Sequence, residues 1–223
     1  NANNTNRNQL ELTRAALGNL SIPDKKTSAE EIILPKFDKQ PNIIFFQLES
    51  TSLWAVNQNP TPMPFLKKLM QDGITVDHFY SNDCHTIGSE FTSLCSMLPD
   101  TREIISSRDD SLEYRCLPEI LHEKLNYLTT AYHANDSSFW HRDKLLPQWG
   151  FDKMVFSPYF RPRAGDETVV AEMAKDISRE DHSPVFDYFI GYTAHSPHTK
   201  DNIYLQLAQN NIRITPYESK LNE

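Results

Sequence analysis

Short apolar runs alternate along this chain with longer segments whose apolar residues recur at helical spacing. The runs predict β-strands over residues 43–48, 74–80, 127–132, 153–156 and 185–192. The periodic segments predict helices over residues 62–71, 86–97, 117–125, 143–149 and 166–179, the last capped by Asp166. Strands that alternate with helices in this way indicate an α/β fold, with a mostly parallel sheet and helices on both faces.

Two of the predicted strands run directly into polar segments. Residues 43–48 are apolar almost without interruption, which is typical of a strand covered on both faces, and Glu49 follows them. The strand over residues 185–192 leads to His195. Functional groups gather beyond the carboxyl ends of strands in open parallel sheets, so we expect a site at this edge. Position alone leaves Glu49 open between a metal ligand and an ordinary surface glutamate.

The segment over residues 82–97 joins a polar turn to an amphipathic helix. Its apolar residues lie at helical spacing and predict one buried face: Ile87, Phe91, Leu94 and Met97. Thr86 stands at or just before the first turn, where free N–H groups and the positive end of the helix dipole favour an oxyanion or a phosphate. The alternative is that Thr86 is an ordinary N-cap, with Ser89 or Glu90 completing a capping box.

Composition narrows the possible functions. With 223 residues, 39% of them hydrophobic, the chain can build one sizeable core, or one domain and a piece of another. The net charge of −8 and the lack of a Lys/Arg cluster argue against a nucleic-acid partner. No window approaches the roughly 18 consecutive apolar residues that cross a bilayer. Residues 10–20 predict a short amphipathic helix, and residues 21–40 an extended, charged linker.

The three cysteines, Cys84, Cys95 and Cys116, fit no zinc spacing and allow at most one intramolecular disulfide. A Cys95–Cys116 bridge would join the helix that follows Thr86 to the start of the next helix. It would close a loop of about 20 residues, contribute roughly 3 kcal/mol and suit an oxidising compartment. Three buried free thiols are the alternative.

Four segments, in this order, resemble the extracytoplasmic domain of lipoteichoic acid synthases, in the sulfatase-like branch of the alkaline phosphatase superfamily. They are PNIIFFQLES (41–50), HTIGSEF (85–91), HANDSSFWHRD (133–143) and YTAHSPH (192–198). The resemblance implies an alkaline phosphatase-like fold. It makes residues 1–40 a linker after a membrane region, and residues 41–223 the N-terminal part of the catalytic domain. It also implies a bacterial, extracytoplasmic location close to the membrane.

The resemblance implies a role for each of five residues. Glu49 matches the acidic metal ligand, and Thr86 the nucleophile, which also touches the metal. Trp140 and Arg142 match residues that hold the phosphoglycerol group of the substrate. His195 matches a histidine near the transferred phosphate. The implied cofactor is a divalent cation, manganese first, with magnesium or zinc as alternatives.

Ordinary structural interpretations of the same side chains remain open. Trp140 alone fits a core aromatic residue, and Arg142 alone fits a surface ion pair. His195 and His133 each fit a hydrogen-bonded histidine at a strand end. The family's Asp-His metal pair is expected downstream of the His195 segment. No such pair follows in the sequence, so we expect an incomplete domain that binds its metal weakly and, as the polypeptide stands, does not turn over.

The function implied is transfer of a phosphoglycerol group from an anionic glycerophospholipid, through a covalent Thr86 intermediate, to a hydroxyl of a polymer or glycan. Two departures leave the substrate open: His85 stands where these synthases tend to have Lys, and His141 where they tend to have Asn. The alternatives are a phosphoethanolamine transferase, a phosphodiester hydrolase, and a module that binds phospholipid head groups or glycans without turnover. A true sulfatase is not expected, because Cys84 lacks the x-Pro-x-Arg sequence that formylglycine formation requires.

Overall fold

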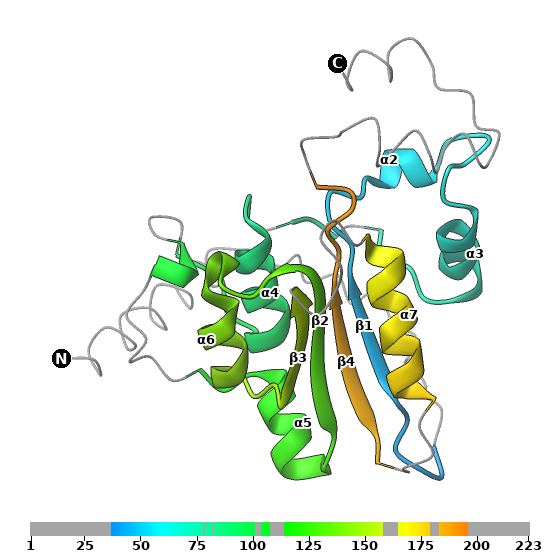
Figure 1. The fold of residues 1–223 in the computed structure, drawn as a ribbon. Helices are drawn as coiled ribbons and strands as arrows, with labels where there is room; N and C mark the ends of the chain where they lie inside the picture. The colour runs from blue at the N-terminus through cyan, green and yellow to red at the C-terminus, as the bar shows by residue number, and fades with distance from the viewer. Residues whose placement is uncertain are drawn as a thin grey trace, which may run out of the picture.

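The computed structural model describes residues 37–77, 79–81, 83–100, 104–107, 114–157, 165–178 and 183–195. Within these ranges one parallel sheet has the strand order β1-β4-β2-β3 (Figure 1). Its strands are β1 (Ile43–Gln47), β2 (Leu128–Asp136), β3 (Lys153–Ser157) and β4 (Val185–Ile190). The predicted parallel sheet is confirmed. Most of the predicted linker, including its amphipathic helix, lies outside the described residues.

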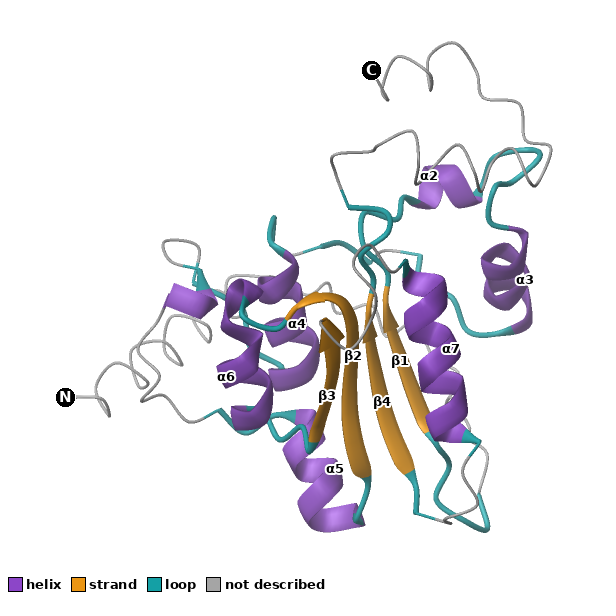
Figure 2. Cartoon of the chain, viewed as in Figure 1, coloured by secondary structure: helices purple, strands orange, loops and turns teal. Residues whose placement is uncertain are grey.

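The α-helices are α2 (Leu53–Val56), α3 (Pro64–Asp72), α4 (Thr86–Cys95), α5 (Leu117–Leu125), α6 (Arg142–Gln148) and α7 (Asp166–Ile177). The described residues also form two 3₁₀ turns, η1 (Ile105–Ser107) and η2 (Phe139–His141). Figure 2 shows the helices in purple and the strands in orange. The five predicted helices are confirmed, with bounds that differ by a few residues. In the described part of the chain, no helix has both the length and the apolarity needed to cross a membrane.

Helices cover both faces of the sheet, as predicted. Successive side chains of a strand point to opposite faces, and on β4 they enter two different cores. Tyr188 joins the larger core, which contains residues of α4, α5 and α6. Phe189 joins the smaller core, which contains Val169 and Met173 of α7. Figure 1 shows α7 on the opposite side of the sheet from α5 and α6.

Strand β1 differs from the prediction of a strand covered on both faces. Ile43 and Phe45 pack against the larger core, whereas Ile44 and Phe46 on the other face are exposed. Among the described residues, α7 packs mainly on β2 and β4, and it leaves the side chains of Ile44 and Phe46 partly open to solvent. The apolar run in β1 correctly predicted a strand but not its coverage.

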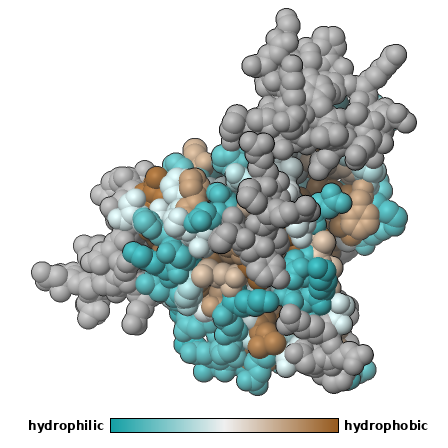
Figure 3. Space-filling view, in the orientation of Figure 1, coloured by the Kyte–Doolittle hydropathy of each residue, from teal (hydrophilic) through white to brown (hydrophobic). Residues whose placement is uncertain are grey.

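Two smaller predictions are wrong. The described residues between 74 and 80 form no strand, and Ile74, Val76 and Phe79 are exposed, because no neighbouring strand pairs with them. Helix α4 ends at Cys95, since Ser96 adopts a left-handed φ of 54°, and Met97 therefore lies beyond the buried face. Apolar surface is visible near α3 at the right edge of the molecule in Figure 3, where Phe65 and Leu69 are also exposed.

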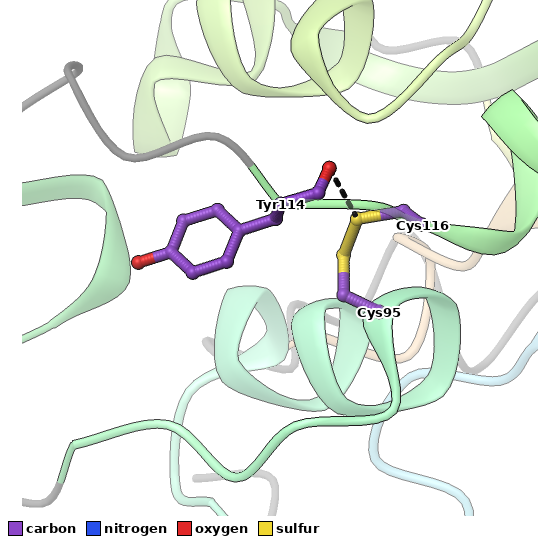
Figure 4. Close-up of a disulfide and its surroundings, with 3 residues drawn as sticks. All are labelled: Cys95, Tyr114 and Cys116. Atoms are coloured by element: carbon purple, nitrogen blue, oxygen red, sulfur yellow. Dashed lines mark hydrogen bonds between the residues drawn. A yellow bond between two sulfur atoms is a disulfide. The ribbon is translucent and has the colours of Figure 1, made fainter. Parts of the chain in front are cut away.

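A disulfide links the end of α4 to the start of α5. Cys95 and Cys116 are bonded, with their Cα atoms 4.1 Å apart, and the Cys116 sulfur lies 3.7 Å from the carbonyl oxygen of Tyr114 (Figure 4). Cys84 is a free, exposed thiol. The predicted Cys95–Cys116 pairing is confirmed, and the alternative of three buried thiols is wrong.

Candidate active site

A cavity of about 310 Å³ opens where the strands of the sheet end. Glu49 follows β1, His133 and Asn135 belong to the end of β2, and Tyr192 and His195 follow β4. The remaining lining residues come from the start of α4, the turn before α6, the first residue of α6 and the residue after β4: Thr86, Phe139, Trp140, Arg142 and Gly191. The fold therefore brings the five predicted site residues to one cavity. This cavity lies at the carboxyl ends of the parallel strands, where sites of open α/β sheets are expected.

The hydroxyl of Thr86 is in direct contact with Glu49. Thr86 Oγ1 donates a hydrogen bond to Glu49 Oε2 at 2.8 Å, and the Ser50 hydroxyl donates to the other carboxylate oxygen at 2.9 Å. A side chain at Gly191 would clash here, because its Cβ would lie 2.8 Å from the Glu49 backbone nitrogen. Close approach of the β4 end to Glu49 thus helps to fix the carboxylate beside the hydroxyl.

Thr86 is the first residue of α4 and not its N-cap. His85 occupies the N-cap position, with an extended backbone and no capping bond from its side chain. The interpretation of Thr86 as an N-cap is therefore wrong, and so is the capping box with Glu90. The Asp83 carboxylate accepts a hydrogen bond from the His85 N–H at 2.9 Å and lies over the first turn. The Thr86 hydroxyl remains available to the cavity at the positive end of the helix dipole.

Arg142 lines the cavity and forms a buried ion pair with Glu90. Its Nε donates to both carboxylate oxygens, at 3.1 and 3.2 Å, and its Nη2 donates to Oε1 at 2.6 Å. The two side chains are 2% and 0% exposed, so the prediction of a surface ion pair is wrong for Arg142. Glu90 was missed as a site residue. The available signal was its spacing of three from Ile87, which places a charged residue in the buried stripe of α4.

The turn before α6 is held in an unusual backbone conformation. Trp140 and His141 both have left-handed φ values, 60° and 52°. Such conformations cost of order 1–3 kcal/mol each and cluster at functional sites. Backbone hydrogen bonds from His141 to Ser138 and from Asp143 to Ser137, both 2.9 Å, stabilise the turn. The turn places Trp140 on the cavity wall, where its ring and the His85 ring form an edge-to-face pair with their centroids 5.4 Å apart.

His133 is a second residue that the sequence did not single out as functional. Its Nδ1 lies 2.9 Å from the Ile190 carbonyl oxygen and must donate to it, which leaves Nε2 as the acceptor of the neutral ring. Burial lowers the pKa of His133 to about 3, with the positive charge of Arg142 acting in the same direction. The ring is hydrogen-bonded as the structural interpretation expected, and it also lines the cavity.

The loop after β4 carries His195 and is tied to α7. Asp166 accepts hydrogen bonds from the N–H of Tyr192, at 2.9 Å, and of Thr193, at 3.0 Å, while its own N–H donates to the Thr193 hydroxyl at 2.8 Å. Gly165 is the N-cap of α7, so the prediction that Asp166 caps this helix is wrong. Burial raises the pKa of Asp166, against the effect of these hydrogen bonds. His195 is exposed at the cavity edge, and its ring stacks on the Tyr192 ring with the two ring centroids 6.3 Å apart.

A divalent cation fits part of this cavity. Glu49 and Thr86 present a carboxylate and a hydroxyl side by side, and these hard oxygen donors suit magnesium or manganese. Among the described residues, no cluster of three or more His, Cys, Asp and Glu side chains could hold a metal ion. Glu49 and Thr86 would thus hold the cation from one side, with further ligands from solvent or from residues outside the described ranges.

Comparison with known proteins places the chain in a family. The sulfatase family model matches residues 41–217. A lipoteichoic acid synthase of Staphylococcus aureus is 30% identical over 183 residues, which cover 73% of this chain. A lipoteichoic acid synthase-like protein of Bacillus subtilis is 26% identical over 172 residues, which cover 71% of this chain. The chain spans 28% of the length of each of these relatives.

Two solved structures share the fold. A lipoteichoic acid synthase from Listeria monocytogenes superposes with a TM-score of 0.64 at 24% identity, covering 70% of this chain and 41% of that one. A protein of the alkaline phosphatase superfamily from Vibrio parahaemolyticus gives a TM-score of 0.64 at 20% identity, covering 73% and 42%. Since the family model covers most of the sequence and the fold agrees, this chain belongs to the sulfatase family of enzymes.

Proposed function

We propose that this domain is part of a metal-dependent phosphotransferase in which Thr86 is the nucleophile. The hydrogen bond between Thr86 Oγ1 and Glu49, at the N-terminus of α4 and inside the cavity, carries the proposal. A free threonine hydroxyl is a poor nucleophile at neutral pH and requires a base or a metal. A bound divalent cation lowers the pKa of the hydroxyl and neutralises charge on a phosphodiester.

The proposed reaction has two steps: the phosphoglycerol group is transferred first to Thr86 and then from Thr86 to the acceptor. The Thr86 hydroxyl gives its proton to the Glu49 carboxylate that accepts its hydrogen bond, and its oxygen forms a bond to phosphorus of a glycerophospholipid head group, while the bond from phosphorus to the diacylglycerol oxygen breaks. His195, at the cavity edge, protonates that leaving oxygen. A hydroxyl of a polymer or glycan then gives its proton to His195 and attacks the phosphoglycerol-threonine diester, and the Thr86 oxygen leaves and takes back the proton from Glu49. Arg142 binds a nonbridging phosphate oxygen, and Trp140 forms an apolar wall beside the glycerol.

The setting proposed for this reaction is the outer side of a bacterial membrane. The relatives reported above include lipoteichoic acid synthases, and these names support an anionic glycerophospholipid donor and a polymeric acceptor. The Cys95–Cys116 disulfide is of the kind that persists in oxidising, extracytoplasmic compartments. We infer that residues 1–40 link the domain to a membrane anchor and that residues 41–223 are the N-terminal part of the catalytic domain.

Mass spectrometry of Thr86 tests the proposal. The intact protein is incubated with manganese and with vesicles that contain phosphatidylglycerol, and peptides that contain Thr86 are then analysed. We expect the mass increment of a phosphoglycerol group on Thr86, and none in Thr86→Ala. Thr92→Ala is the matched control, because Thr92 lies on the same helix and is not among the cavity-lining residues.

The other outcomes identify the alternatives. A phosphoethanolamine adduct, formed only with phosphatidylethanolamine vesicles, would make the enzyme a phosphoethanolamine transferase. Lipid turnover with water as the acceptor would make it a phosphodiester hydrolase. No adduct and no turnover, together with retained binding of the vesicles, would favour a binding module and overturn the proposal.

A further inference from the structure

We infer that Glu90 is a positioning residue that holds the Arg142 guanidinium so that its unpaired edge is kept for an anionic oxygen of the substrate. The inference rests on the proposed function and extends it to a residue without a contact to the reacting atoms. It depends on the geometry of the Glu90–Arg142 pair, its burial, and the place of Glu90 on α4.

Glu90 occupies one edge of the guanidinium and leaves another without a partner. The pair uses Nε and Nη2 of Arg142, which lie on the same edge of the planar group. Nη1 is buried and has no hydrogen-bond partner among the described residues. Arginine can bind two planar anions at once through two such edges. The edge that includes Nη1 is therefore available to a phosphate oxygen in the cavity that Arg142 lines.

Stability does not account for this arrangement. A buried ion pair contributes little or nothing beyond what well-packed apolar residues of the same volume would contribute. A buried N–H group without a partner costs a further 1–3 kcal/mol or so. A buried ion pair and an unpartnered N–H group at the wall of a cavity are explained if the substrate supplies the hydrogen-bond acceptor for Nη1.

The place of Glu90 on α4 links it to the nucleophile. Glu90 follows Thr86 by four residues, about one helical turn or 6 Å along the axis, at 1.5 Å per residue. One rigid helix thus sets the position of the nucleophilic oxygen and, through the ion pair, the orientation of Arg142. The distance between attacking oxygen and bound phosphate is then fixed by a single element.

The test measures the rate of adduct formation on Thr86 in the intact protein, with manganese and phosphatidylglycerol vesicles at saturation. Glu90→Gln keeps the size of the side chain and removes the charge that fixes the guanidinium. We expect the rate to fall about 100-fold, the typical cost of a small misplacement in an active site. Glu123→Gln is the matched control, because Glu123 also pairs with an arginine, Arg115, on the exposed surface of α5. We expect no change in its rate.

A double-mutant comparison separates positioning from simple support of the fold. If Glu90 acts through Arg142, then Glu90→Gln should cost less than threefold when Arg142 is already replaced by Lys. Equal fold-losses in the wild-type and Arg142→Lys backgrounds would overturn the inference. So would a wild-type rate in Glu90→Gln. If Glu90→Gln does not fold, as judged by near-UV circular dichroism, Glu90→Asp takes its place in the same comparison, since it keeps the charge and shortens the reach.

A second measurement does not depend on turnover. Binding of glycerol phosphate to the Thr86→Ala protein, followed by calorimetry, should weaken about tenfold when Glu90→Gln is added, because Arg142 loses its orientation. Unchanged affinity would also overturn the inference. Absence of any adduct in the wild type, with this loss of affinity still present, would instead count against the proposed function alone.

Discussion

Among the described residues, each face of the sheet buries one carboxylate, and the negative charge is compensated differently on the two faces. On the face covered by α4 and α6, Glu90 is paired with Arg142 through three hydrogen bonds. On the α7 face, Asp187 of β4 is 1% exposed, and its Oδ2 has no hydrogen-bond partner among the described residues. The pKa of Asp187 is raised to about 7, mainly by burial and also by the negative charge of Asp176, while Lys153 opposes the shift.

The difference shows where this fold maintains charge in its interior. A carboxylate that is buried with a cation can remain charged and orient a functional group, whereas one buried without a direct partner favours the protonated form. The first arrangement lies beside the cavity and the second lies under α7, away from it. Four sets of variants test this comparison, from the largest expected effect to the smallest.

Glu90→Leu should have the largest effect. It leaves the buried Arg142 guanidinium without compensation, and we expect a loss of about 3–5 kcal/mol in the free energy of unfolding. The double variant Glu90→Leu/Arg142→Met should recover most of that loss, because two apolar side chains replace the ion pair. Chemical denaturation of each variant gives these values. A double variant as unstable as Glu90→Leu would show that packing, and not the unpaired charge, causes the loss.

The disulfide stabilises the α4 side of the sheet, and within the described residues no second disulfide crosses the α7 side. Replacing both Cys95 and Cys116 with Ser should cost about 3 kcal/mol, because the 21-residue separation sets the chain entropy that the bond removes from the unfolded state. A reducing agent should lower the melting temperature of the wild type and leave that of the double variant unchanged. Cys84→Ser is the control and should match the wild type.

Asp187→Asn should change how stability depends on pH. Because folding raises the pKa of Asp187 from 3.8 to about 7, its contribution is fully present below pH 4 and is lost as the pH rises through 7. Between pH 5 and pH 8 we expect the free energy of unfolding of the wild type to fall by on the order of 2 kcal/mol from this group. The variant should lack that part of the fall. Parallel curves for the two proteins would show that Asp187 is compensated by an interaction outside the described residues.

Lys68→Ala should have the smallest effect and serves as the exposed counterpart of Glu90→Leu. Lys68 and Asp72 form an i,i+4 ion pair on α3 at 2.7 Å, with both side chains more than half exposed. Exposed helical pairs of this kind contribute about 0.3–0.5 kcal/mol, and salt screens them. Thermal denaturation at low and high salt should show a difference of this size at low salt only. A loss above 1 kcal/mol would mean that exposure does not decide the value of an ion pair here.

The sequence predicted the sheet and its helices because both depend on local periodicity. The predictions were wrong where the structure of a segment depends on which element lies beside it. Residues 74–80 are as apolar as a strand, yet the described part of this segment has no partner strand. The apolar run of β1 predicted cover on both faces, whereas in the described part of the chain α7 packs mainly on β2 and β4, and Ile44 and Phe46 are exposed. Periodicity records the preference of a segment and contains no information on which element lies beside it.

The candidate site was likewise predicted in part: the sequence identified its residues but not all of their contacts. Motif order pointed to Glu49, Thr86, Trp140, Arg142 and His195, and the structure brings all five to one cavity. The partner of Arg142 could not be read from the chain, because Glu90 lies 52 residues away and had a plausible local explanation as a capping-box residue. The position of Thr86 was predicted to within one residue, and that residue decides whether its hydroxyl caps α4 or bonds to Glu49 in the cavity.

The contacts of helix α4 limit which changes of sequence this domain can tolerate. Its residues are attached to three other parts of the molecule: Thr86 to Glu49, Glu90 to Arg142, and Cys95 to Cys116. A helix turns by about 100° per residue, so one inserted or deleted residue between positions 86 and 95 would rotate at least one of these attachments away from its partner. Substitutions at the exposed Ser93 leave all three in place. This helix should therefore tolerate changes of residue but not of length, whereas the exposed segment over residues 74–77 should tolerate both.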